Sequence, residues 1–191
     1  QCDLKLNERL GLTFDRLPIQ EQATITVANA LTTDWTDILP PSESVVIAGN
    51  PPFIGARMKS KAQAADLEMA WGDDYSGDLD FVTGWHARAM QYFAGCNGSW
   101  AFVASNSLCQ GQSPPLVFAP LHREGWRIKY AHRTFLWTSE ARGEAKVHCV
   151  IVGFSREVKT PRLFDYPDGI TPVAVPVERI NSYLVDAPWT L

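Results

Sequence analysis

The chain has 191 residues, of which 46% are hydrophobic and 20% are charged, a composition typical of soluble globular proteins. This length allows one domain with a hydrophobic core, or one domain with a short appendage. The N-terminus has no apolar signal segment, and no apolar run reaches the roughly 18 residues of a membrane span. We therefore expect a cytoplasmic protein with no membrane partner.

The charged residues are distributed unevenly along the chain. The net charge of -4 argues weakly against nucleic acid as a partner. Residues 120–162, however, carry 9 Lys and Arg against 4 Asp and Glu. A local positive stretch in an acidic chain is typical either of a phosphate-facing surface or of an ordinary solvated face, and charge alone leaves both interpretations open.

The four cysteines are Cys2, Cys96, Cys109 and Cys149, and none of them forms a Cys-x-x-Cys pair. A zinc site usually shows such paired spacing, so this pattern argues against one. We expect free thiols and no bound metal.

The first predicted elements are two strands and a helix. Residues 23–31 are rich in β-branched side chains and predict a strand. Residues 44–50 predict a second strand, whose continuous apolar character is typical of a buried parallel sheet. A helix is predicted over 76–95, with Asp78 as its N-cap and Gly95 at its end.

The same alternation continues through the second half of the chain. A strand is predicted over 98–108 and a helix over 114–125. The strands predicted over 126–135 and 146–154 are joined by a polar segment, which indicates an antiparallel hairpin. Alternating strands and helices predict an α/β fold with a mostly parallel sheet and an antiparallel C-terminal hairpin.

The most informative short stretch is Asn50-Pro51-Pro52-Phe53, which ends the second predicted strand. In open α/β sheets the active site lies at the carboxyl ends of the strands. Proline has a fixed φ and no N–H, so the backbone that leaves the strand here is conformationally restricted. It presents the Asn50 side chain and backbone carbonyls outward.

Two such acceptors suit an exocyclic aromatic amine. They can hold both of its N–H groups and localise the nitrogen lone pair for attack on a methyl donor, without a strong general base. Phe53 would offer a flat face to a base that has left the duplex. The alternative interpretation is a strand that ends in a proline turn with Phe53 in the core, because four residues can recur by chance.

Longer stretches resemble a known family. Asn-Pro-Pro-Phe after an apolar strand resembles the catalytic motif of amino-group DNA methyltransferases, in which a leading Asn favours adenine over cytosine. Four blocks, from roughly Leu4 to Phe154, resemble the MmeI-like methyltransferases of type II (IIL and IIG) restriction-modification proteins. These blocks are "GNPPFIGARMKSKAQAADLEMAWG", "LDFVTGWHARAMQY", "AFVASNSLCQG" and "YAHRTFLWTSEARGEAKVHCVIVGF".

The resemblance implies a partial Rossmann-like class I fold, S-adenosylmethionine as cofactor, double-stranded DNA as partner and methylation of the adenine amino group. It implies catalytic roles for Asn50, Pro51, Pro52 and Phe53, cofactor contacts for Asn29 and Ala30, and a target-base pocket that includes Asp80 and Phe135. A strand-end cap is the alternative role for Asn29, and a core aromatic between two strands is the alternative for Phe135.

Basic residues near these blocks are candidates for contacts to the DNA backbone. Such contacts position the duplex without reading its sequence. The candidates are Arg57, Lys59, Lys61, Arg133, Arg142 and Lys146.

The glycine-rich cofactor loop of this family, and the acidic residue that holds the cofactor ribose, are not found in the sequence. We therefore expect residues 1–154 to be the catalytic part of a methyltransferase domain whose first strands are missing, with the N-terminal part of the same polypeptide as a partner. The first strand would lie between those predicted at 23–31 and 44–50. We interpret residues 155–191 as an appendage or the start of a target-recognition region.

Two other functions stay open at this point. Asn-Pro-Pro-Phe also suits methyltransferases that act on protein glutamine or on RNA, because a glutamine amide poses the same chemical problem. A fold that binds nucleic acid without methylating it is the second alternative. We expect the isolated chain to bind S-adenosylmethionine poorly and to be inactive, because the cofactor loop is not present in it.

Overall fold

A computed structural model describes residues 23–137 and 147–188 of the chain. The elements in chain order are η1 (Trp35–Asp37), β1 (Val46–Gly49), η2 (Ala56–Met58), α2 (Lys61–Trp71), η3 (Gly72–Asp74), α3 (Thr83–Tyr92), β2 (Ser99–Ser105), η4 (Asn106–Cys109), α4 (Ser113–Arg123), β3 (Arg127–Trp137), β4 (Val147–Ser155), β5 (Arg162–Asp165) and β6 (Val173–Val175).

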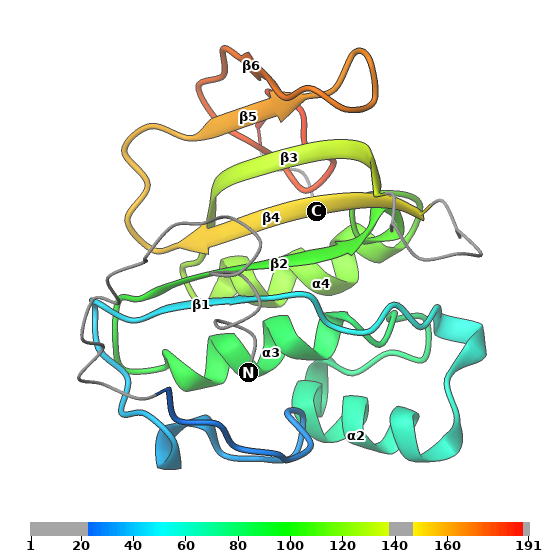
Figure 1. Cartoon of the computed structure of the whole chain (residues 1–191), viewed down its shortest axis with the longest axis vertical. Coiled ribbons are helices and arrows are strands. Elements are labelled where there is room, and N and C mark those ends of the chain that lie inside the picture. Colours follow the sequence, from blue (N-terminus) through cyan, green and yellow to red (C-terminus); the bar gives the residue numbers. More distant parts are fainter. Residues whose placement is uncertain (1–22, 138–146, 189–191) are drawn as a thin grey trace, which may run out of the picture.

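The strands form a six-stranded sheet in the order β1-β2-β4-β3-β5-β6 (Figure 1). The β1–β2 and β3–β5 pairs are parallel, whereas β2–β4, β3–β4 and β5–β6 are antiparallel. The predicted α/β class and the antiparallel hairpin of β3 and β4 are therefore confirmed. Among the described residues the sheet is mixed rather than mostly parallel, because three of its five strand pairs are antiparallel.

Residues 23–31 were expected to be a strand, and this prediction is wrong. They contain no strand, and Ile25 and Val27 are 84% and 97% exposed. A β-branched sequence becomes a strand only when a neighbouring strand accepts its backbone hydrogen bonds. Among the described residues β1 pairs only with β2. No strand therefore lies beside residues 23–31 to accept their backbone hydrogen bonds.

Helix α2 was not predicted, although the sequence carries a signal for it. Ser60 accepts a hydrogen bond from the Gln63 backbone N–H, and the Gln63 side chain accepts one from the Ser60 N–H. This reciprocal pair is a capping box, which satisfies two backbone donors at the start of a helix. Leu67 and Trp71 are buried on the face of α2 that packs on α3.

Helix α3 begins at Thr83 rather than at residue 76, and Asp78 is not its N-cap. Residues 76–82 form turns instead. Thr83 Oγ1 donates to the Asp80 carbonyl oxygen at 2.7 Å, while the Asp80 carboxylate accepts from a different segment of the chain. The polar groups that could have extended the helix are therefore used to shape the loop in front of it.

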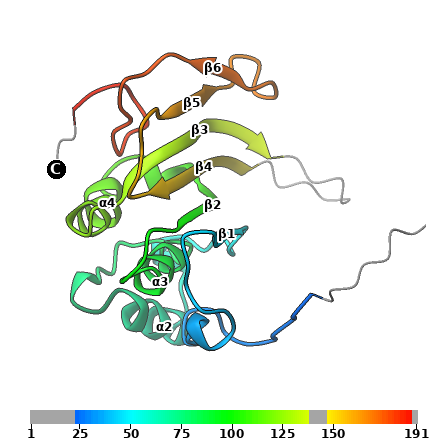
Figure 2. The ribbon, with the colours of Figure 1, turned by 90° about the vertical axis from the view of Figure 1, so that its left-hand side faces the viewer.

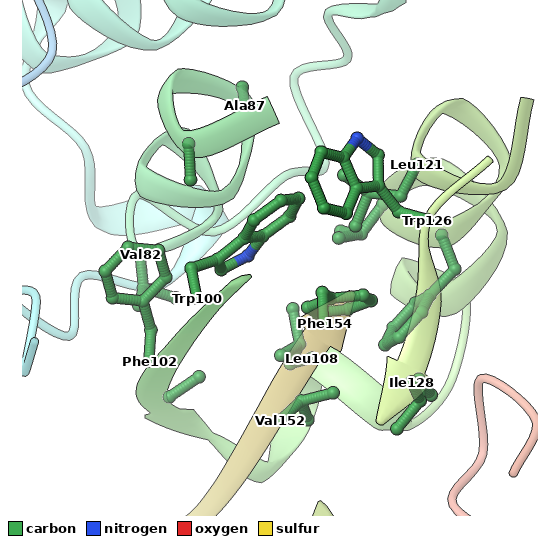
Figure 3. Packing of buried hydrophobic residues seen from close by; sticks show 14 of the residues in the cluster. Val82, Ala87, Trp100, Phe102, Leu108, Leu121, Trp126, Ile128, Val152 and Phe154 are labelled. Carbon is green, nitrogen blue, oxygen red and sulfur yellow. The ribbon is translucent and has the colours of Figure 1, made fainter. Parts of the chain in front are cut away.

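The hydrophobic core lies between the sheet and the helices α3 and α4, which cover the same face of the sheet (Figures 2 and 3). Trp100 of β2 and Trp126 before β3 are buried, with ring centroids 4.3 Å apart. Phe154 of β4 stacks on Trp100 at 5.3 Å. Large buried rings contribute much of the apolar area that stabilises a domain of this size.

Residues 155–188 extend the same sheet. Strand β5 pairs with β3, and β6 pairs with β5 (Figure 1). The following loop buries Ile180 and Leu184 against the core. Prolines and turns interrupt this part of the chain, so its hydrophobic pattern did not predict these short strands. Within the described residues, no helix is both long and apolar enough to cross a bilayer.

Candidate active site at the carboxyl edge of the sheet

Four strands end at one edge of the sheet, which we call the carboxyl edge. Strands β1 and β2 are parallel, β2 and β3 are both antiparallel to β4, and β5 is parallel to β3. All four therefore point the same way. Ser105 at the end of β2 and Phe135 near the end of β3 lie opposite Cys149 of β4 from its two sides. Two strand spacings separate them, which is about 10 Å.

The Asn-Pro-Pro-Phe segment leaves β1 at this edge. Asn50 is exposed, Pro51 is buried, Pro52 is exposed, and Phe53 is half-buried against the core. Pro51, with its fixed φ, restricts the backbone directly after the exposed Asn50. Asn50, Pro51 and Pro52 line one end of an open groove of about 720 Å³, which continues along β1 to Val45.

Two long-range contacts fix the loop that follows this segment. The Phe81 N–H donates to the Ile54 carbonyl oxygen at 2.9 Å, and the Ala56 N–H donates to Asp80 Oδ1 at 2.7 Å. Both partners come from the turn before α3. The exit of β1 is thus tied to the start of α3, and this restricts where Asn50 can move.

Asp80 is the centre of a polar cluster with two serines after β2. Its Oδ2 accepts hydrogen bonds from Ser105 Oγ at 3.3 Å and from Ser107 Oγ, and the two hydroxyl oxygens are 2.6 Å apart. Asp80 is half-buried and its carboxylate contacts protein groups, so its place in a target-base pocket stays a prediction. Sequence reasoning did not single out Ser105 or Ser107. The run Ser-Asn-Ser at the end of a predicted strand was the available signal.

The described basic candidates have different surroundings. Arg57 and Lys61 are exposed beside the loop after Phe53. Lys59 instead donates through Nζ to the carbonyl oxygens of Gly77 and Leu79, and burial lowers its pKa although Asp80 and Asp78 oppose that shift. Lys59 therefore stabilises the turn before α3, whereas Arg57 and Lys61 are free to face a partner.

Arg133 is engaged within the protein. Its Nε donates to the Leu184 carbonyl oxygen at 2.8 Å, and its Nη1 lies 3.4 Å from Asp165 Oδ2. This side chain links β3 to β5 and to the C-terminal loop. Arg142 and Lys146, the other two candidates near the hairpin, lie outside the described residues.

Phe135 is half-buried in a group of aromatic side chains at the other end of the carboxyl edge. Its ring centroid is 5.0 Å from that of Tyr166, which follows β5, and 6.1 Å from that of Trp137. His132 Nδ1 and the Tyr166 hydroxyl share a hydrogen bond of 2.8 Å. Burial lowers the pKa of His132, which favours the neutral imidazole. Tyr166 was not among the residues selected from the sequence.

The two candidate cofactor residues lie elsewhere. Asn29 donates to Asp66 Oδ2 at 2.8 Å, and its side-chain oxygen accepts from the Leu31 N–H at 3.0 Å. Because residues 23–31 are not a strand, this is a turn contact and not the strand-end cap considered as the alternative. The Ala30 carbonyl oxygen accepts from the Trp35 indole. Neither Asn29 nor Ala30 lines the groove beside Asn50.

The lining of the groove differs from what S-adenosylmethionine would need. Its wall is mainly apolar, with Trp35, Ile38, Leu39, Trp85 and Tyr92 facing the β1 segment, and no described carboxylate lines it. The cofactor carries ribose hydroxyls and a charged amino-acid group, which need polar partners. The described residues that line the groove therefore do not form a complete site for this cofactor. Nor do His, Cys, Asp and Glu side chains of the described ranges form a cluster of three that could hold a metal ion.

An α/β sheet with Asn-Pro-Pro-Phe directly after β1 matches the methyltransferase-like domain that the sequence resemblance predicted, and comparisons with known proteins show its family. The sequence model of the MmeI DNA-methyltransferase domain matches residues 1–165. The chain is 33% identical over 183 residues to DNA methyltransferase A of Bacillus subtilis (strain 168), a match that covers 94% of this chain and 20% of that protein.

A solved structure shows the same similarity. The type IIL restriction-modification enzyme MmeI, in complex with DNA, matches with a TM-score of 0.83 and 38% identity, over 97% of this chain and 25% of that one. The chain belongs to the MmeI DNA-methyltransferase domain family, so the resemblance seen in the sequence is confirmed. It spans a quarter or less of the length of these two relatives.

Proposed function

We propose that the chain is the methyl-acceptor part of an adenine-specific DNA methyltransferase, which uses S-adenosylmethionine in the full-length protein and belongs to a cytoplasmic restriction-modification enzyme. The observation that carries this proposal is the exposed Asn50 at the carboxyl end of β1, set on a buried proline and lining a groove. Membership of the DNA-methyltransferase family supports DNA as the substrate. The structure of MmeI in complex with DNA supports a duplex as the partner.

The proposed mechanism uses fixed hydrogen-bond acceptors. The Asn50 side-chain oxygen and the Pro51 carbonyl accept the two N–H groups of the adenine amine. Their dipoles favour a tetrahedral nitrogen, localise its lone pair and stabilise the positive charge that develops there. Because the Asp80 cluster and the Ile54–Phe81 contact hold this loop in advance, little reorganisation is needed when the amine arrives.

Adenine reaches such a site only after it leaves the helical stack. Phe135, at the same edge of the sheet, would pack against the extruded base, and Phe53 would border it from the β1 side. Arg57 and Lys61 are the exposed candidates for phosphate contacts. Phosphate contacts would position the duplex, while reading of the base sequence would belong to other parts of the polypeptide.

The test is methyl transfer by the full-length protein, with tritiated S-adenosylmethionine, mixed-sequence duplex DNA and analysis of the digested nucleosides. We expect label on adenine and a loss of about 10²–10³-fold in kcat for Asn50→Ala, the magnitude found when one preorganised hydrogen-bonding group is removed from an active site. Asn97→Ala is the matched control, because Asn97 is an exposed asparagine that precedes β2 at the opposite edge of the sheet.

Two results would overturn the proposal. An Asn50→Ala protein that keeps full activity would exclude the role of Asn50. Label that appears only on protein or RNA, and never on DNA, would move the activity to a different substrate class.

A further inference from the structure

The aromatic cluster around Phe135 is organised by a segment that follows β5. Tyr166 is the nearest ring, with its centroid 5.0 Å from that of Phe135 and an interplanar angle of 31°. Trp137, two residues along β3, lies at 6.1 Å. Tyr166 lies beyond residues 1–165, the range that matches the methyltransferase domain family. A residue outside the matched range therefore contributes to the packing around the Phe135 ring.

The Tyr166 ring is itself held by a second pair of aromatic side chains. Its hydroxyl shares the 2.8 Å hydrogen bond with His132 Nδ1. The His132 ring stacks on Phe164, with centroids 4.6 Å apart and an interplanar angle of 12°. Since His132 and Phe164 are register partners on β3 and β5, this stack lies on the paired backbones of two strands. Tyr166 is thereby fixed at its hydroxyl as well as at its ring.

The backbone after Tyr166 is also attached to β3. The Leu136 N–H donates to the Gly169 carbonyl oxygen at 3.3 Å, and the Gly169 N–H donates to the Tyr166 carbonyl oxygen at 2.9 Å. Gly169 has a φ of +76°, which side chains with a Cβ rarely adopt. Asp168 Oδ1 accepts the N–H groups of Ile170 and Thr171 and stabilises the same turn. The turn is thus bonded to the residue next to Phe135.

We propose that Tyr166 is a positioning residue that holds the Phe135 ring in the orientation that receives the extruded adenine. The chemical reason is that stacking requires a plane that is already oriented, because a ring free to rotate loses entropy when the base arrives. Tyr166 contacts the ring, His132 restrains Tyr166, and the turn at 166–169 ties both to β3. This inference rests on the proposed function, in which Phe135 packs against the target base.

The experiment uses the full-length protein and duplexes in which 2-aminopurine replaces the target adenine, once the methylated site has been mapped on treated DNA. Fluorescence of 2-aminopurine rises when the base leaves the stack, so it reports extrusion separately from DNA binding. The variants are Tyr166→Ala, Tyr166→Phe, Phe135→Ala and the Tyr166→Ala/Phe135→Ala double variant. Tyr183→Phe is the matched control for the loss of a tyrosine hydroxyl, because Tyr183 is 43% exposed.

On the 2-aminopurine duplexes we expect Tyr166→Ala to lower the fluorescence rise about tenfold. Because 2-aminopurine lacks the 6-amino group that is methylated, kcat is measured on matched duplexes that keep the target adenine. There kcat should also fall about tenfold while KM for DNA stays within about twofold, because base–aromatic stacking alone is worth about 1–3 kcal/mol. Tyr166→Phe keeps the ring and loses the bond to His132, so its loss should be about two- to threefold. In the Phe135→Ala background, Tyr166→Ala should have no further effect, because the two residues act through the same ring.

Each contrary result has a distinct meaning. Additive losses in the double variant, or an unchanged fluorescence rise for Tyr166→Ala, would overturn the positioning role while leaving Phe135 as the stacking residue. If Phe135→Ala alone has no effect, the placement of the base in the proposed function fails, and this role fails with it. If Tyr166→Ala does not fold, Tyr166→Phe decides, and fluorescence equal to wild type would refute the proposal.

Discussion

The two ends of the carboxyl edge are held in different ways. Beside β1 and β2, the Asp80 carboxylate accepts hydrogen bonds from Ala56, Ser105 and Ser107 and fixes a backbone loop. Beside β3 and β5, the Phe135 ring is held by contacts with the rings of Tyr166 and Trp137, and Tyr166 is held in turn by a hydrogen bond to His132. Hydrogen bonds have narrow ranges of length and angle, whereas ring contacts tolerate more variation. The first end therefore suits the chemical step on the amine, and the second suits a flat base.

Of the substitutions that test this difference between the two ends, Asp80→Ala is expected to have the largest effect on kcat. The substitution leaves the Ala56 N–H and both serine hydroxyls without their common acceptor, and a displacement of about 1 Å at a reacting group can cost about 10²-fold. We expect kcat to fall by about that factor while DNA affinity changes little. The measurement is single-turnover methyl transfer together with a DNA-binding titration.

Asp78→Ala is the control, because Asp78 is an exposed carboxylate in the same turn. The two ends would not be independent if Asp80→Ala also abolished the 2-aminopurine signal at Phe135.

A smaller effect is expected from Ser107→Ala. One hydrogen bond to the carboxylate is lost, but Ser105 and the Ala56 N–H still hold Asp80. A loss of about 1 kcal/mol corresponds to roughly a fivefold lower kcat. Ser42→Ala, an exposed serine bonded to Ser44, is the control in the same kinetic assay. A loss as large as that of Asp80→Ala would show that Ser107 takes part in the reaction rather than in support.

The smallest expected effect is on the salt dependence of DNA affinity, and it distinguishes the two nearby basic residues Arg57 and Lys59. Arg57 is exposed, whereas Lys59 is bonded to the carbonyl oxygens of Gly77 and Leu79. Removal of one phosphate contact lowers the slope of log affinity against log salt by about 0.9. We expect this change for Arg57→Ala and an unchanged slope for Lys59→Met, as measured by fluorescence anisotropy over a range of salt concentrations. Equal slopes for both variants would contradict the different roles assigned here.

Local sequence predicted several elements well because their causes are local. The predicted strand at 44–50 contains β1, and the predicted hairpin forms as β3 and β4. The capping box at Ser60 is an equally local signal for α2, although hydrophobic periodicity does not reveal it. The start of α3 could not be predicted in the same way, because the Asp80 carboxylate bonds to Ala56, 24 positions away, instead of capping the helix.

The sequence by itself determined the exit of β1, since two prolines after an asparagine restrict the backbone wherever they occur. It also determined the family, which the comparisons confirmed. Only the tertiary structure decided that residues 23–31 are not a strand, because a strand exists only with a partner. Tertiary structure likewise joined Ser107 to Asp80 across 27 positions and Tyr166 to His132 across 34. Such contacts depend on how strands are ordered in the sheet, and no local pattern encodes that order.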